Sequence, residues 1–177
     1  GLDISFDLGL IDNFQCEVHA FDPTPASVEY CKKASVGNSK FNFHEYGVWH
    51  VTDTLKFYHA RAENEIECSL VNIQKTDKFT LVSVRKLTDV LEELGHKYID
   101  LIKIDIEGAE YELIQLIVDE NVFIKVICIE YDEMFNRIDK KFINRIRHSV
   151  RQLKMAGYRL VADQGYGNFT FVHKSCL

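Results

Sequence analysis

Three groups of acidic residues follow apolar segments of this sequence, where carboxylates could bind a ligand or move a proton. Asp22 ends the segment VHAFD, and a second group, Asp105, Glu107 and Glu110, lies at the end of IDLIKI and just beyond it. The third group, Glu130–Glu133, follows VICI. In an open parallel α/β sheet, ligands bind beyond the carboxyl ends of the strands. The three groups are therefore candidates for one shared site.

Asp22 suits the recognition of a nucleotide. A carboxylate that closes a strand can accept hydrogen bonds from both hydroxyls of a ribose. Asp22 and Pro23 also form a common turn sequence. The turn interpretation explains Pro23 but leaves the choice of Asp over Asn or Ser open, so both interpretations remain.

The group around Asp105 suits acid–base chemistry. Crowded carboxylates raise one another's pKa, which favours a general base near neutral pH or a site for a divalent cation. Alternatively, Glu107 or Glu110 only stabilises the positive end of the next helix. Asp105 is harder to explain in that way, because it lies within the apolar strand pattern. Glu130–Glu133 is either a wall of the same cleft or a solvated turn.

The remaining candidate residues give weaker indications of catalysis or ligand binding. The seven histidines have no HxxxH or HExxH spacing, so the sequence does not predict a histidine-built zinc site. The five cysteines include no CxxC pair and are expected to be free thiols. Trp49 could flank an adenine or pack in the core, and the core is favoured. Basic residues between 139 and 156 are expected on a solvated surface.

The elements that must position these residues alternate between strand and helix. Apolar spacing and capping residues predict helices at Asp3–Gln15, Ala26–Ala34, Leu87–Leu94, Ala109–Val118 and Asp139–Ala156. Strands are predicted at Cys16–Phe21, Asn42–Tyr46, Leu55–His59, Phe79–Val84, within Ile99–Gly108, and at Lys125–Glu130, Tyr158–Ala162 and Phe169–His173. This order predicts an α/β fold with a mostly parallel sheet, helices on both faces and a C-terminal antiparallel hairpin. Without repeats or linkers, residues 1–177 are expected to form a single domain.

The composition indicates which classes of substrate and binding partner suit the chain. The 177 residues are 46% hydrophobic and 27% charged, which is typical of one globular domain. The net charge of −6 argues against a broad attraction to nucleic acid or anionic lipid, so a small-molecule or carbohydrate substrate fits better. No apolar run reaches the roughly 18–20 residues that a membrane span needs. The composition leaves the compartment open between the cytoplasm and, if a targeting segment was removed, the secretory pathway.

Several stretches resemble a known family. Ile99–Glu110, IDLIKIDIEGAE, resembles the signature of FkbM-type methyltransferases, and Asp3–Ile11, Val18–Thr24 and His44–Trp49 resemble one branch of that family. The resemblance covers most of the chain. It implies a Rossmann-like sheet of seven strands, S-adenosylmethionine as methyl donor, and O-methylation of a hydroxyl on a sugar or another small molecule.

The resemblance also implies roles for individual residues. Asp105 and Glu107 would be catalytic, with one of them as the general base, and no metal is predicted. Asp22 would hold the ribose, the start of the first helix would face the methionine end, and the stretch at 47–49 would lie near the adenine. The implied cofactor-binding residues are Gly1, Asp3, Asp22, Gly47, Val48, Trp49 and Asp105.

The chain departs from the family at its start. In such folds a central strand and a Gly-rich turn precede the first helix, and here only Gly1 of that turn is present. We therefore expect the first strand to be missing from the chain. This departure keeps two alternatives open: a non-catalytic Rossmann-like binding domain and a nicotinamide-dependent dehydrogenase. The second is weakened because the chain contains no GxGxxG.

Overall fold

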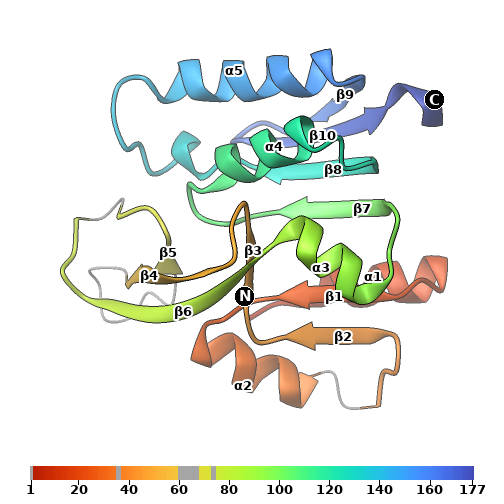
Figure 1. The fold of residues 1–177 in the computed structure, drawn as a ribbon, viewed down its shortest axis with the longest axis vertical. Helices are drawn as coiled ribbons and strands as arrows, with labels where there is room; N and C mark the ends of the chain where they lie inside the picture. The colour runs from red at the N-terminus through yellow and green to blue at the C-terminus, as the bar shows by residue number, and fades with distance from the viewer. Residues whose placement is uncertain (1, 35–36, 60–67, 73–74) are drawn as a thin grey trace.

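A computed structural model describes residues 2–34, 37–59, 68–72 and 75–177 of the chain, which form a mixed α/β fold (Figure 1). The helices are α1 (Ser5–Phe14), α2 (Pro25–Ala34), α3 (Leu87–Leu94), α4 (Glu110–Asp119) and α5 (Phe142–Met155), with short 3₁₀ turns η1 (Asp132–Met134) and η2 (Lys174–Cys176). The strands are β1 (Val18–Phe21), β2 (Phe41–His44), β3 (Gly47–Trp49), β4 (Asp53–His59), β5 (Cys68–Ser69), β6 (Phe79–Lys86), β7 (Ile99–Ile104), β8 (Ile124–Glu130), β9 (Tyr158–Asp163) and β10 (Asn168–His173).

The strands pair in three sheets. β1 and β2 form a parallel pair, and a second sheet has the order β7-β8-β10-β9, in which only β7 and β8 are parallel. The third sheet has the order β3-β6-β4-β5, with β3 and β6 parallel and the other pairs antiparallel. The predicted C-terminal hairpin is present as β9 and β10. The expectation of a mostly parallel sheet is wrong for the described pairings, because β4 and both strands of the hairpin pair antiparallel.

The carboxyl ends of the parallel strands face one side of the molecule. In Figure 1, the arrowheads of β1, β2, β7 and β8 all point toward the side where β4, β5 and β6 lie. β7 and β8 are rich in Ile, and side chains such as Ile104 and Ile127 are buried against the helices. This burial removes apolar surface from water and stabilises the strands whose ends carry the acidic residues.

Local backbone conformation sets the end of α3 and the start of α5. α3 stops at Gly95, which has a left-handed conformation with φ of 70°, as expected for a glycine after a helix. α5 begins at Phe142, three residues after the predicted start at Asp139. Asp139 instead accepts a hydrogen bond from the backbone N–H of Lys141 at 2.7 Å, which holds the chain in a turn before the helix.

No helix in the described part of the chain has both the length and the apolar character that a membrane span requires.

Candidate functional site

Asp22 follows β1 and is held in place by the turn that starts α2. Its Oδ1 accepts hydrogen bonds from the backbone N–H of Thr24 at 2.9 Å and from the Thr24 hydroxyl at 2.7 Å. Burial acts to raise the pKa of Asp22, but hydrogen bonds, including those from Ser27 and Thr24, lower it below the usual value. The turn interpretation is thus correct, and the hydrogen bonds of this turn favour the ionised form of Asp22, which accepts hydrogen bonds from hydroxyls.

β3 starts beside the Asp22 turn and leads to the second acidic group. A Cβ atom on Gly47 would lie 3.2 Å from Val84 Cγ1 and 3.8 Å from Pro23 Cγ, so Gly47 lets β3 pack closely against Val84 of β6, next to the residue after Asp22. Val48 and Trp49 pack against the core, which confirms the role that the sequence favoured for Trp49. The Trp49 Nε1–H also donates a hydrogen bond to the carbonyl of Ala109 at 3.3 Å.

Asp105 directly follows β7 and is exposed. Its Oδ2 lies 2.5 Å from Nζ of Lys103, two residues earlier on the same strand. Lys103 also acts on Asp3, at the start of α1. The pKa of Asp3 is lowered, mainly by the hydrogen bond from the Ser5 backbone N–H at 2.8 Å and further by the charge of Lys103. Asp3 therefore lies within electrostatic range of Lys103, whereas Gly1 lies outside the described residues.

Glu107 and Gly108 form the sharp turn between β7 and α4. Both have left-handed backbone conformations, with φ of 55° at Glu107 and 92° at Gly108. This conformation is costly for a residue with a side chain, so its surroundings must hold it in place. The Ser69 hydroxyl, on β5, donates a hydrogen bond to the Glu107 carbonyl. Contact with β5 therefore stabilises the unusual turn.

β5 also lies close to Asp22. The pKa of Cys68, next to Ser69, is raised mainly by burial and in part by the negative charge of Asp22. Ser69 contacts the Glu107 turn, and Cys68 lies within range of the charge of Asp22, so this two-residue strand lies near the ends of both β1 and β7. Two predicted acidic groups thus come together at one edge, as the parallel-strand argument requires.

Glu110 has the most strongly shifted pKa of the acidic group. It is fully buried, and its Oε1 accepts a hydrogen bond from the Gly108 N–H at 2.7 Å. Burial, and secondarily the charges of Asp132 and Asp105, raise its pKa to about 8. The pKa values of Glu130 and Asp132 are raised as well, again mainly by burial. For Glu110 the sequence predicted the direction of the shift but attributed it to crowding, which is the smaller cause.

Glu133 has a structural role. The suggestion of a solvated turn at residues 130–133 is wrong, because Tyr131, Asp132 and Glu133 are buried. Glu133 Oε2 accepts hydrogen bonds from Arg145 Nε at 2.7 Å and from the Tyr111 hydroxyl at 2.8 Å, and a second Arg145 nitrogen binds its Oε1. Arg145 was expected in solvent with the other basic residues of α5, and instead it anchors η1.

The site therefore combines an ionised carboxylate at Asp22, an exposed carboxylate at Asp105 and a buried acidic layer beneath them. The first can accept hydrogen bonds from hydroxyls, and the second can take a proton from a bound alcohol. Sequence reasoning did not identify Lys103 as part of the site. Its position two residues before Asp105 in a strand places both side chains on the same face, which was a usable indication.

Comparison with known proteins indicates the family. The family model described as "Methyltransferase FkbM domain" matches residues 8–160. A rat (Rattus norvegicus) protein named "Probable methyltransferase-like protein 24" is 26% identical over 120 residues, which cover 68% of this chain and 26% of the rat protein. The crystal structure of methyltransferase FkbM from Methylobacillus flagellatus KT superposes with a TM-score of 0.55 at 16% identity, over 98% of this chain and 42% of that one. The chain thus spans less than half the length of either protein.

Proposed function

The chain belongs to the FkbM methyltransferase family, and on this premise we propose that it transfers the methyl group of S-adenosylmethionine to a hydroxyl oxygen of a sugar or another small molecule. The observation that carries the proposal is the position of β5 near both Asp22, whose charge acts on Cys68, and the Glu107 turn, whose carbonyl accepts a hydrogen bond from Ser69. An ionised acceptor for a ribose and candidate bases for an alcohol are the groups that such a reaction requires.

The residues around Asp22 fit the donor. Its carboxylate, kept ionised by the turn, would accept hydrogen bonds from the two ribose hydroxyls. Gly47, Val48 and Trp49 would line the adenine, and Asp3 and Gly1 would face the methionine end, as the resemblance implies. The donor supplies an electrophilic methyl group. The protein would align the acceptor oxygen with it and exclude water.

Asp105 or Glu107 would remove the proton of the acceptor hydroxyl. Asp105 is the more accessible of the two, and its ion pair with Lys103 orients its carboxylate. Glu107 lies on the strained turn next to it. A general base contributes on the order of 10²–10⁴ in rate.

The Rossmann-like arrangement is part of the same proposal. The parallel pairs β1–β2 and β7–β8 direct their carboxyl ends to one side (Figure 1), as that fold requires. A strand between β1 and β7 would join the two pairs into one sheet, which stays a prediction from the resemblance. The interpretation of residues 1–177 as one methyltransferase domain is likewise part of the proposal.

Calorimetric titration with S-adenosylhomocysteine tests the donor site. The Asp22→Ala variant should bind about 10- to 100-fold more weakly, because it loses charged hydrogen-bond acceptors. The control is Asp12→Ala, an exposed residue of α1. Absence of binding by the unsubstituted chain, or equal affinity of the Asp22→Ala variant, would contradict the proposal.

Transfer of radiolabelled methyl groups to a panel of sugars and small alcohols tests the base. Asp105→Asn should lower turnover, measured at saturating donor, by about 10²–10⁴. Asp100→Asn is a matched control, since Asp100 lies on β7 as well and pairs with Lys125 at 2.6 Å. If the Asp105→Asn and Glu107→Gln variants both keep full turnover, the assignment of the base is wrong.

A further inference from the structure

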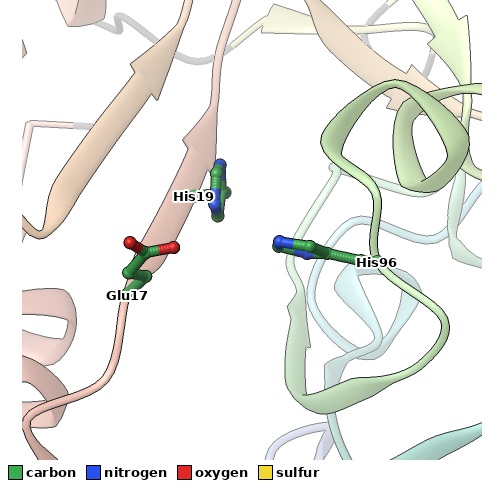
Figure 2. Close-up of side chains that lie close together, drawn as sticks. All are labelled: Glu17, His19 and His96. Atoms are coloured by element: carbon green, nitrogen blue, oxygen red, sulfur yellow. The ribbon is translucent and has the colours of Figure 1, made fainter.

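Three side chains from two distant segments meet at the amino end of β1. Glu17 precedes β1, His19 lies within it, and His96 belongs to the turn between α3 and β7. One ligand atom from each residue lies within 4.8 Å of the other two. Figure 2 shows the His96 ring pointing toward the His19 ring, with the Glu17 carboxylate beside His19; the two rings are nearly perpendicular and their centroids are 5.3 Å apart.

The backbone holds both histidines in place. His19 is fixed by the parallel pairing of β1 with β2, where it lies opposite Asn42. The backbone N–H of His96 donates to the Leu91 carbonyl at 2.8 Å, in the turn that ends α3 at Gly95. The two imidazoles are therefore brought together by regular elements rather than by a long loop.

His19 has a buried nitrogen without a partner. Its Nδ1 lies 3.0 Å from Nε2 of His44, whereas its own Nε2 is shielded from solvent and makes no hydrogen bond to any residue that the structure describes. Buried polar atoms nearly always have a partner, so this nitrogen needs an explanation. When the Nδ1–H donates to His44, Nε2 carries a lone pair. This is the arrangement of a metal-binding histidine whose second nitrogen is fixed by a neighbour.

We propose that Glu17, His19 and His96 form a binding site for a divalent transition metal, with zinc as the best match, and that a water molecule takes the fourth position. Two imidazoles and one carboxylate are an established zinc ligand set. The ligand atoms of tetrahedral zinc lie about 3.3 Å apart, because the bonds are about 2.0–2.1 Å long. Glu17 and His96 are exposed, so their side chains are free to rotate and close the remaining distance.

The position of this cluster indicates a structural role. It lies at the amino ends of β1 and β7, whereas Asp22 and Asp105 follow their carboxyl ends. β1 and β7 belong to different sheets in the described structure. A metal ion bound by His19 and His96 would tie β1 to the turn before β7. The inference thus goes beyond the proposed methyl transfer and does not depend on it.

Sequence spacing could not reveal this site. Glu17 and His19 are two residues apart, but they match none of the recognised metal motifs, such as HExxH. His19 and His96 come from different elements, and only the fold brings them together.

Zinc titration of the chelator-treated chain tests the proposal. We expect saturable binding of one zinc ion per chain by calorimetry, together with a rise in Tm, because a ligand that binds only the folded state stabilises it. Replacing zinc by Co²⁺ should give the intense visible absorption of tetrahedral coordination. Saturation at several ions per chain, or binding without a rise in Tm, would overturn the proposal.

Because Glu17 and His96 are exposed, their side chains can be replaced without disturbing the fold. His96→Gln and Glu17→Gln should each weaken zinc binding at least tenfold and abolish the zinc-dependent rise in Tm, while Tm without zinc stays the same. His148→Gln is the matched control, because His148 is also an exposed histidine, on α5. Equal affinity of the His96→Gln variant and the unsubstituted chain, or an equal loss in the His148→Gln variant, would contradict a site at this cluster.

Discussion

Replacing Glu110 by Gln should make the stability of the protein less dependent on pH. Glu110 is fully buried; its Oε1 accepts a hydrogen bond from Gly108, and its Oε2 has no hydrogen-bond partner among the described residues. Because burial raises its pKa to about 8, the side chain is protonated in the folded protein at neutral pH. Glutamine has nearly the same shape as the protonated acid and keeps a carbonyl oxygen for Gly108.

The sign and size of the effect follow from the pKa. The folded state holds a proton that the unfolded chain releases above its ordinary pKa of 4.5. The stability from this group is therefore fully present below pH 4.5 and is lost as the pH rises toward 8. Each pH unit in this interval costs about 1.4 kcal/mol, so the total loss is about 5 kcal/mol. The Gln variant does not titrate and should not suffer this loss.

Urea unfolding at pH 5 and pH 8 measures the difference. Relative to the unsubstituted chain, the Glu110→Gln variant should gain about 3–4 kcal/mol of unfolding free energy between these two pH values. Glu112→Gln is the control, since Glu112 lies on the same first turn of α4 but is exposed, and it should change the pH dependence little. Parallel pH profiles for the Glu110→Gln variant and the unsubstituted chain would refute the argument that burial keeps Glu110 protonated.

Three further substitutions test the packing around the site. Arg145→Ala should lower the unfolding free energy by about 3–5 kcal/mol in chemical denaturation, because it leaves the buried Glu133 carboxylate without its cation; a loss no larger than that of Lys141→Ala would contradict this. Gly167→Ala should cost about 1–3 kcal/mol by the same measurement, since φ is +84° and the new Cβ would lie 2.7 Å from the Tyr131 carbonyl oxygen; an unchanged denaturation midpoint would rule out this strain. Trp49→Phe removes one hydrogen bond and should cost about 0.5–1.5 kcal/mol, measured by thermal unfolding, whereas a stabilised variant would show that the bond has no net value.

The repetitive parts of the fold were predictable from sequence, whereas the short strands were not. The apolar run that forms β7 and the glycine that ends α3 identify their elements, because burial and backbone conformation act locally there. β3 and β5, with three and two residues, are too short for any periodicity to appear. Their existence depends on pairing with β6 and β4.

The site was predictable where it depends on strand ends and unpredictable where it depends on burial. Asp22 and Asp105 follow apolar strands, so the sequence marks their positions. The spacing of Leu113, Ile114 and Ile117 places Glu110 on the buried face of α4, but its complete burial and raised pKa depend on the packed fold. The pairing of Glu133 with Arg145 likewise depends on the packing of α5 against η1.

The proposed zinc site and the proposed donor site lie near opposite ends of β1, so each can be tested without the other. His19 and Asp22 lie near opposite ends of this strand and, at about 3.3 Å per residue, are roughly 10 Å apart. A zinc ion at His19 is therefore too far away to contact a donor held by Asp22. Any effect of zinc on donor affinity must act through the position of β1, and thermodynamic linkage requires the donor to change zinc affinity by the same factor. Equal donor affinity in the presence and absence of zinc would show that β1 is already in place without the metal, and would leave both sites standing as independent features of one strand.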